Sequence, residues 1–301
     1  MRQDRDFGLI VALLALSAAV PLFAGEYWVS LGVSLLMAIA LTQSWSVLSG
    51  LSGYVSLGHV VFYGLGAWLV VVSWGTITPW ISIPLAALAA MAFAALVGAP
   101  VLRVRGPYFV ILSFGVAELV KYLVIAIESA LGKASRLLLG TPAIESIFYM
   151  MLALAIGATA LAWGVRAVRL GRGLRAIREN EEAAETLGVP VAGYKLLAFV
   201  LSAAVPGAVG GVMALRSTYF EPLQIFDPMI SFNMIATAII GGSDDLRGPV
   251  VGAVVLTLLF ELLWANAPQL YMIIMGLLLI VFVLFVPDGI CGRLAAGRRP
   301  R

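Results

Sequence analysis

The sequence predicts an all-α, polytopic membrane protein, and this fold class follows from its composition, its long apolar segments and the placement of its basic residues. Hydrophobic residues make up 62% of the 301 residues and charged residues 12%, whereas soluble domains have roughly 45–50% and about 25%. The mean hydropathy is +1.04. A single histidine, His59, and a single cysteine, Cys291, exclude an intrachain disulfide and a metal site built from several such side chains.

A helix needs about 20 apolar residues to cross a bilayer, and about ten segments of the chain approach that length. They are 7–24, 28–48, 54–74, 81–102, 108–127, 147–168, 193–215, 228–242, 249–265 and 269–286. The segment 228–242 is shorter than the others, so it predicts a short or broken span. We expect one transmembrane domain over residues 1–301, interrupted by one large polar segment at 166–195.

The basic residues predict the orientation, because Lys and Arg are enriched in cytoplasmic loops. With the N-terminus in the cytoplasm and ten crossings, all but four of the 19 Lys and Arg fall on the cytoplasmic side. The exceptions are Lys121, Lys133, Arg136 and Arg216. We therefore predict that both termini and the polar segment are cytoplasmic, and that the loops 128–146 and 217–227 face the other compartment.

The polar segment 166–195 contains ten charged residues between two apolar spans. Its residues 174–187 include no Pro or Gly and are rich in Ala, Glu, Arg and Leu, which predicts a helix that ends at Gly188, shortly before Pro190. The apolar residues of this helix form a narrow stripe: Leu174, Ile177, Ala184 and Leu187. The segment is either a solvated connecting helix or a surface on which a partner docks.

Glycine is concentrated in the segments 50–66 and 241–252. Such clusters allow helices to pack closely, and they also allow a broken helix whose free N–H and C=O groups bind a substrate. The candidates for a translocation path are Gly53, Ser56, Gly58, His59, Glu118, Gly241 and Gly242. A structural alternative stays open for each: His59 can be a packing residue, and Glu118 can pair with Lys121 inside its span.

The chain contains no motif for nucleotide hydrolysis or metal-dependent catalysis. Its three lysines, Lys121, Lys133 and Lys195, are not followed by Ser or Thr, so the phosphate-binding sequence G-x-x-x-x-G-K-[ST] is absent. We expect this chain to have no catalytic residue, metal ligand or cofactor of its own. If ATP drives its work, a separate subunit binds the ATP.

The residues Glu182 to Gly188 read E-A-A-x-x-x-G and resemble the start of the EAA loop of ABC importer permeases. The surrounding run 171–215 resembles the LivM-type family of branched-chain amino acid permeases, as do the segments 50–68, 102–119 and 241–252. The acidic pair Asp244 and Asp245 departs from that family's pattern. The resemblance covers most of residues 45–288.

This resemblance implies the membrane-spanning subunit of an importer in the bacterial inner membrane. Its implied partners are a second permease of a different kind, two ATP-binding subunits, an external solute-binding protein and membrane lipid, with no nucleic acid. It also implies a cytoplasmic coupling helix over 174–188. The residues it assigns to ATPase coupling are Arg175, Glu182, Ala183, Ala184 and Gly188. Permeases for urea, short-chain amides or other amino acids are alternatives within the family, and an ion-coupled secondary transporter is the alternative outside it.

Overall fold

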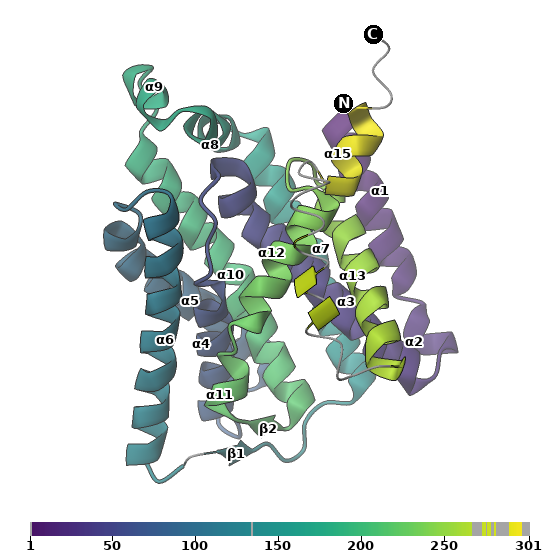
Figure 1. Cartoon of the computed structure of the whole chain (residues 1–301). Coiled ribbons are helices and arrows are strands. Elements are labelled where there is room, and N and C mark those ends of the chain that lie inside the picture. The colour runs from purple at the N-terminus through teal and green to yellow at the C-terminus, as the bar shows by residue number, and fades with distance from the viewer. Residues whose placement is uncertain are drawn as a thin grey trace.

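The computed structural model describes residues 2–133, 135–266, 273–274, 276–277, 280 and 289–296. Within these ranges the chain is a bundle of helices with one short antiparallel pairing of two strands, which confirms the all-α class. In Figure 1 the start of α1 (Arg2–Ser17) and α15 (Gly289–Ala296) lie at the same end of the bundle as α8 (Arg169–Glu179) and α9 (Glu181–Thr186). The two β-strands lie at the opposite end.

Each of the first nine predicted spans corresponds to a helical segment of the structure. The tenth span, 269–286, lies almost entirely outside the described residues. Seven apolar stretches of the described chain are long enough to cross a membrane, and α4 (His59–Val72) is a shorter apolar helix. The helices after α1 and the short α2 (Val20–Phe23) are α3 Glu26–Trp45, α4 His59–Val72, α5 Pro79–Val101, α6 Pro107–Ala130, α7 Ile144–Ala167, α10 Val191–Ser217, α11 Pro222–Ile225, α12 Met229–Gly241 and α13 Arg247–Asn266.

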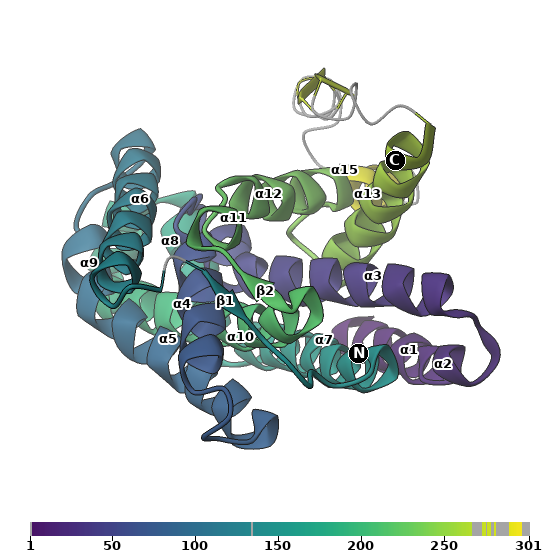
Figure 2. The same cartoon turned by 90° about the horizontal axis from the view of Figure 1, so that it is seen from below.

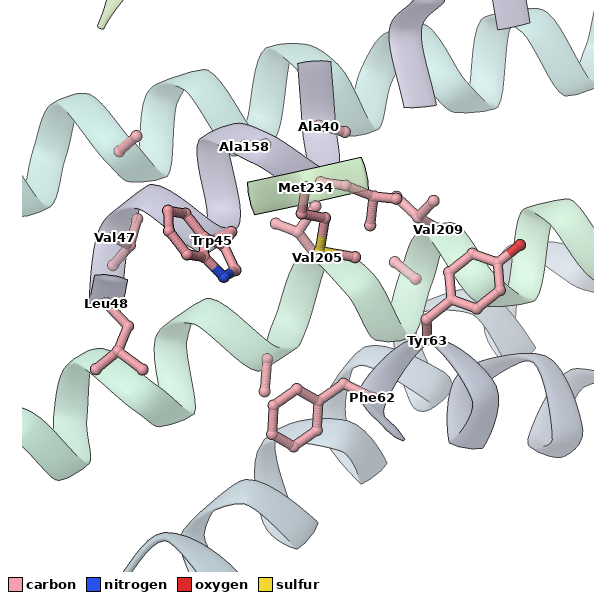
Figure 3. Packing of buried hydrophobic residues seen from close by; sticks show 14 of the residues in the cluster. Ala40, Trp45, Val47, Leu48, Phe62, Tyr63, Ala158, Val205, Val209 and Met234 are labelled. Carbon is pink, nitrogen blue, oxygen red and sulfur yellow. The ribbon is translucent and has the colours of Figure 1, made fainter. Parts of the chain in front are cut away.

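Helix α10 lies at the centre of the bundle, with α4 and α5 against one side and α3 and α7 against another (Figure 2). Its small residues permit this, because a Cβ added at Gly210 would lie 1.9 Å from the carbonyl oxygen of Tyr63 on α4. Figure 3 shows Phe62 and Tyr63 facing Val205 and Val209 of α10. Close packing of this kind supplies most of the attraction between helices in lipid.

The end of the bundle opposite α8 and α9 is closed by a pairing of two short strands. Strand β1 (Arg136–Leu137) runs antiparallel to β2 (Tyr219–Phe220). The buried carboxylate of Glu128 at the end of α6 accepts hydrogen bonds from Arg136 Nε at 2.8 Å and from Trp68 Nε1 at 2.8 Å. These contacts join β1 to both α4 and α6.

The polar segment folds as two helices, so the prediction of one continuous helix over 174–188 was wrong. Helix α8 spans Arg169–Glu179 and α9 spans Glu181–Thr186. Between them Asn180 has an extended backbone, and its side-chain oxygen accepts a hydrogen bond from Ala183 N at 3.0 Å. An N-cap of this kind starts a new helix. The predicted end is confirmed, since Gly188 has φ +82°.

Candidate functional site

The chain between α3 and α4 is not a simple loop but a broken helix, and we call residues 46–58 the helix break. After α3 the chain passes through one π-helical turn, η1 Ser46–Gly50, and then loses helical structure at Gly53–Gly58. This is why the predicted span 54–74 begins as a helix only at His59. All five residues of η1 are buried. The break is therefore an irregular backbone inside the protein.

Serine hydroxyl groups accept hydrogen bonds from the backbone that the break leaves free. Ser113 Oγ on α6 accepts from Leu57 N at 3.1 Å, and Ser231 Oγ on α12 accepts from Val60 N at 3.1 Å. The break's own Ser52 and Ser49 accept longer bonds of 3.4 Å from Tyr54 N and Ser56 N. A buried backbone away from water needs such partners. Sequence reasoning identified the glycines and Ser56 here but missed Ser49, Ser52, Ser113 and Ser231.

His59, the first residue of α4, is fully enclosed by protein. Its Nε2 lies 3.2 Å from Ser202 Oγ on α10, and its ring packs edge-on against Phe62 and Phe199. Gly58 beside it approaches α6, because an added Cβ would lie 3.0 Å from the carbonyl oxygen of Ser113. These contacts give both residues a packing role in the conformation described here.

The other predicted path residues lie in three places. Ser56 is buried in the break, and its carbonyl oxygen accepts a hydrogen bond from Trp45 Nε1 at 3.0 Å. Glu118 on α6 pairs with Lys121, whose Nζ lies 2.5 Å from Glu118 Oε2, as the structural alternative predicts. Gly241 ends α12 where the chain meets the start of α13, since its added Cβ would lie 1.8 Å from the carbonyl oxygen of Gly248.

The structure brings together only part of the predicted path. Gly242 follows Gly241 in the loop between α12 and α13, and the next residue, Ser243, packs on Gly50 of the break. A separate cavity of about 350 Å³ lies between α3, α12 and α13. None of the predicted path residues lines it. Its polar lining residues are Ser34, Thr42, Asn233, Thr237, Thr257 and Glu261.

The predicted coupling residues lie on α8 and α9, which we call the α8–α9 pair. Arg175, Glu182 and Ala183 are exposed, and Gly188 ends the pair in an exposed turn. Ala184 instead is only 2% exposed and belongs to the buried base of the pair, together with Leu174 and Ile177. Leu187, the last residue of the predicted apolar stripe, is 82% exposed. The extended backbone at Asn180 separates the two helices, and α9 lies at the outer edge of the bundle in Figure 1.

Beneath the α8–α9 pair, Glu181 connects four parts of the fold through one polar network. Its Oε1 accepts a hydrogen bond from Lys195 Nζ on α10 at 2.8 Å, and its Oε2 accepts one from Tyr54 OH in the break at 2.5 Å. Arg105, after α5, places its Nε 3.3 Å from Glu181 Oε1. Lys195 also donates to the carbonyl oxygen of Leu102 at 3.2 Å.

The charge state of Glu181 follows from the same contacts. Burial by itself raises the pKa of a carboxyl group, because it penalises the charged form. The hydrogen bonds from Lys195 and Tyr54, and the charges of Lys195 and Arg105, outweigh burial and hold the pKa of Glu181 below its usual value. The network therefore contains a carboxylate at neutral pH.

A second contact ties the α8–α9 pair to the break. Arg178 Nη1 donates to the carbonyl oxygen of Gly50 at 2.9 Å, and Arg178 also pairs with Asp244. Gly53 has φ +76°, a left-handed backbone that favours glycine. An added Cβ at Gly53 would lie 3.2 Å from Cγ of Arg178. The arginine side chain thus lies along the break from Gly50 to Gly53.

A cavity of about 450 Å³ opens beside this contact, and charged side chains form much of its wall. Its lining residues include Asp6, Arg166, Arg175, Arg178, Glu179 and Asp245. Arg166 is 3% exposed, and its Nη2 donates to the carbonyl oxygen of Ser243 at 3.1 Å. In the described ranges, no three His, Cys, Asp or Glu side chains come together in a group that could hold a metal ion.

Comparison with known proteins now identifies the family. The model of the family described as branched-chain amino acid transport system / permease component matches residues 25–283. The chain belongs to this permease family. The chain is therefore a permease subunit of an ABC importer. Its family and its apolar helices together show that it is a multi-pass protein of the inner membrane.

Three similar permeases show the range of the family. The high-affinity branched-chain amino acid transport system permease protein LivM of Escherichia coli (strain K12) is 28% identical over 315 residues, which cover 93% of this chain and 74% of the relative. The nucleoside ABC transporter permease protein NupC of Lactococcus lactis subsp. cremoris is 30% identical over 58% of this chain and 62% of its own. LivH of Escherichia coli (strain K12) is 29% identical over 48% of this chain and 45% of its own. No solved structure matches.

Proposed function

We propose that this permease translocates branched-chain amino acids into the cytoplasm and that separate ATP-binding subunits, docked on the α8–α9 pair, drive the transport. The substrate follows from the name of the LivM relative, which aligns with 93% of the chain. The chain carries no phosphate-binding loop of its own, so ATP binds to the partner subunits. The permease itself is not an enzyme.

The observation that carries the docking proposal is the contrast between the two faces of the α8–α9 pair. Its base is buried through Leu174, Ile177 and Ala184, whereas Leu187 projects with 82% of its surface exposed. Leu187 lies outside the membrane-spanning helices, so covering it with a partner protein would remove apolar surface from water, which favours association. The same end of the bundle is the one that the basic residues predict to be cytoplasmic.

The complete importer contains a second permease and a solute-binding protein. LivM and LivH of Escherichia coli carry the name of the same transport system, and both are similar to this chain. We therefore propose a heterodimer of two related permeases. The solute-binding protein docks at the opposite end of the bundle, on the loops 128–146 and 217–227, and releases its substrate between the two permeases.

The docking proposal is tested by replacing Leu187 with Arg and measuring how much ATP-binding subunit co-purifies with the permease. We expect Leu187→Arg, and separately Ala183→Arg, to lose most of it. Leu139→Arg is the matched control, because Leu139 is 76% exposed but lies outside the helices at the opposite end of the bundle. Ala184→Arg is a poor test, since Ala184 is buried and its replacement disturbs the fold. Full co-purification with Leu187→Arg contradicts the proposal.

The substrate is tested by uptake with a panel of compounds, because the similarity to NupC extends over 58% of the chain. The expected result is saturable uptake of labelled leucine that isoleucine and valine inhibit. Urea and nucleosides should not compete. Uptake of a nucleoside in preference to leucine would assign the chain to another substrate while leaving the docking proposal intact.

A further inference from the structure

The burial of Glu181 and Lys195 is not explained by stability alone. Their side chains are 13% and 5% exposed, and desolvation of two charges can cost more free energy than their attraction returns. An apolar pair could fill the same space. Both oxygens of the carboxylate are nevertheless engaged, one by Lys195 on α10 and the other by Tyr54 in the helix break. Through these contacts Glu181 joins α9 to α10 and to the helix break.

The contacts of Arg178 and Glu181 hold the break at two points. Arg178 donates to the carbonyl oxygen of Gly50, and Glu181 accepts from the hydroxyl of Tyr54. Between these points Gly53 lies against the stem of Arg178. A displacement of the α8–α9 pair would therefore be carried to residues 50–54 directly, without first bending one of the long helices.

The break is the part of the bundle best able to respond. Its amide groups at Tyr54 and Ser56 are bonded to serine hydroxyls at 3.4 Å, longer than a typical hydrogen bond. A few element-terminal residues that absorb changes in φ and ψ are the usual hinges of a conformational change. Helix α4, which follows the break, packs closely against α10, so movement at the break has a rigid unit to displace.

We propose that Glu181 is the positioning residue that transmits movement of the α8–α9 pair to the helix break and to α10, and that the pair and the break move as one body. This inference rests on the proposed function, because it needs a partner that moves the α8–α9 pair. It adds the route by which that movement enters the membrane-spanning helices. Glu181 passes the movement to Tyr54 in the helix break and to Lys195 on α10.

The first test compares Glu181→Gln with Glu26→Gln in the whole importer, reconstituted in vesicles with its ATP-binding subunits and leucine-loaded binding protein. Glu26 is an exposed carboxylate at the start of α3, outside the α8–α9 pair and outside the loops proposed to receive the binding protein. The readout is leucine uptake per ATP hydrolysed. We expect Glu181→Gln to lower this ratio roughly tenfold while ATP hydrolysis continues. Glu26→Gln should leave it unchanged.

Three results of this test would overturn the inference. An unchanged ratio in Glu181→Gln shows that the network does not transmit movement. Equal loss of uptake and hydrolysis, with less assembled complex, assigns Glu181 a structural role. Loss of the ATP-binding subunits from Glu181→Gln alone assigns it to the docking surface. If the unsubstituted permease fails to retain these subunits, it is the proposed function that fails instead.

A second test uses a disulfide to ask whether the pair and the break move together. A Cβ added at Gly53 would lie 3.9 Å from Cβ of Arg178, within the range of about 3.5–4.5 Å that a disulfide requires. The double variant Gly53→Cys/Arg178→Cys is made with Cys291→Ser, which removes the native thiol. The left-handed backbone at position 53 strains a cysteine placed there. This strain is present in both the oxidised and the reduced protein, so it does not affect the comparison between them.

Movement as one body predicts that the oxidised double variant transports at least as much leucine per ATP as the reduced form. The disulfide then replaces the contact that Arg178→Cys removes. If oxidation instead stops uptake and a reductant restores it, residues 53 and 178 must separate during transport and the inference is wrong. Each single variant, Gly53→Cys or Arg178→Cys, serves as the control and should not respond to the oxidant.

Discussion

Gly210 of α10 lies so close to Tyr63 of α4 that an added Cβ would approach the tyrosine carbonyl oxygen to 1.9 Å. The carbonyl oxygen belongs to the backbone and cannot move aside without shifting the helix. Gly66 has the same relationship to Gly207, at 1.9 Å. The two helices therefore cross through contacts between backbones, and the position of α4, which follows the helix break, depends on them.

Replacing Gly210 with Ala is expected to destabilise the permease by about 1–3 kcal/mol, because the methyl group overpacks the crossing. The thermal unfolding of the purified protein in detergent measures this effect. Gly157→Ala is the control, since nothing lies within 4 Å of a Cβ added at Gly157. That control should be neutral or slightly stabilising, as alanine favours helix formation. A neutral Gly210→Ala would refute the close crossing.

Replacing Glu128 with Ala is expected to loosen the loop before β1. The change leaves Arg136 without its buried partner and removes the acceptor of Trp68 Nε1, a loss of about 3 kcal/mol for a pair broken on one side. Limited proteolysis should then cleave residues 131–143 faster than in the unsubstituted permease. Glu145→Ala changes an exposed carboxylate next to the same loop and should leave the rate unchanged.

The contribution of Glu181 to stability should depend on pH in one direction. Its pKa in the folded protein lies below the ordinary value of 4.5. Stability from the carboxylate is therefore complete above pH 4.5 and is lost as the pH falls through the folded pKa. The difference in melting temperature between the unsubstituted permease and Glu181→Gln should be constant near neutral pH and shrink in acid. A difference that grows in acid would contradict the assigned network.

Replacing Asn180 with Ala removes the side-chain acceptor at the start of α9. Loss of an N-cap of this kind costs about 1 kcal/mol, and α9 has only six residues to spread that loss over. We expect faster amide hydrogen exchange at Ala183, whose N–H is bonded to Asn180 Oδ1. Asn180→Asp keeps an acceptor and should restore protection, while equal exchange in all three proteins would exclude the cap.

Much of the fold could be predicted because its signals are local. The apolar segments located the helices, and Gly188 with Pro190 located the end of α9. The division of the polar segment at Asn180 was missed, although asparagine followed by Glu181 and Glu182 is a typical helix start. Absence of Pro and Gly from residues 174–187 had suggested continuity, but a capping side chain was enough to end α8.

The polar network could not be predicted, because its members are far apart in the sequence. Tyr54 and Glu181 are separated by 127 residues and Lys195 by a further 14. No periodicity or motif relates them, and only the packing of α10 against the break brings them together. The serines that satisfy the break were hidden for the same reason. Ser113 and Ser231 lie on other helices and resemble ordinary polar residues of a span.

The most direct test of the account is leucine uptake into vesicles that contain the purified permeases, with ATP and the ATP-binding subunits on the α8–α9 side and the solute-binding protein on the other. The account predicts that uptake requires all of these components and stops when Leu187→Arg prevents docking of the ATP-binding subunits. Leucine uptake by this chain alone, driven by an ion gradient and indifferent to ATP, would contradict it.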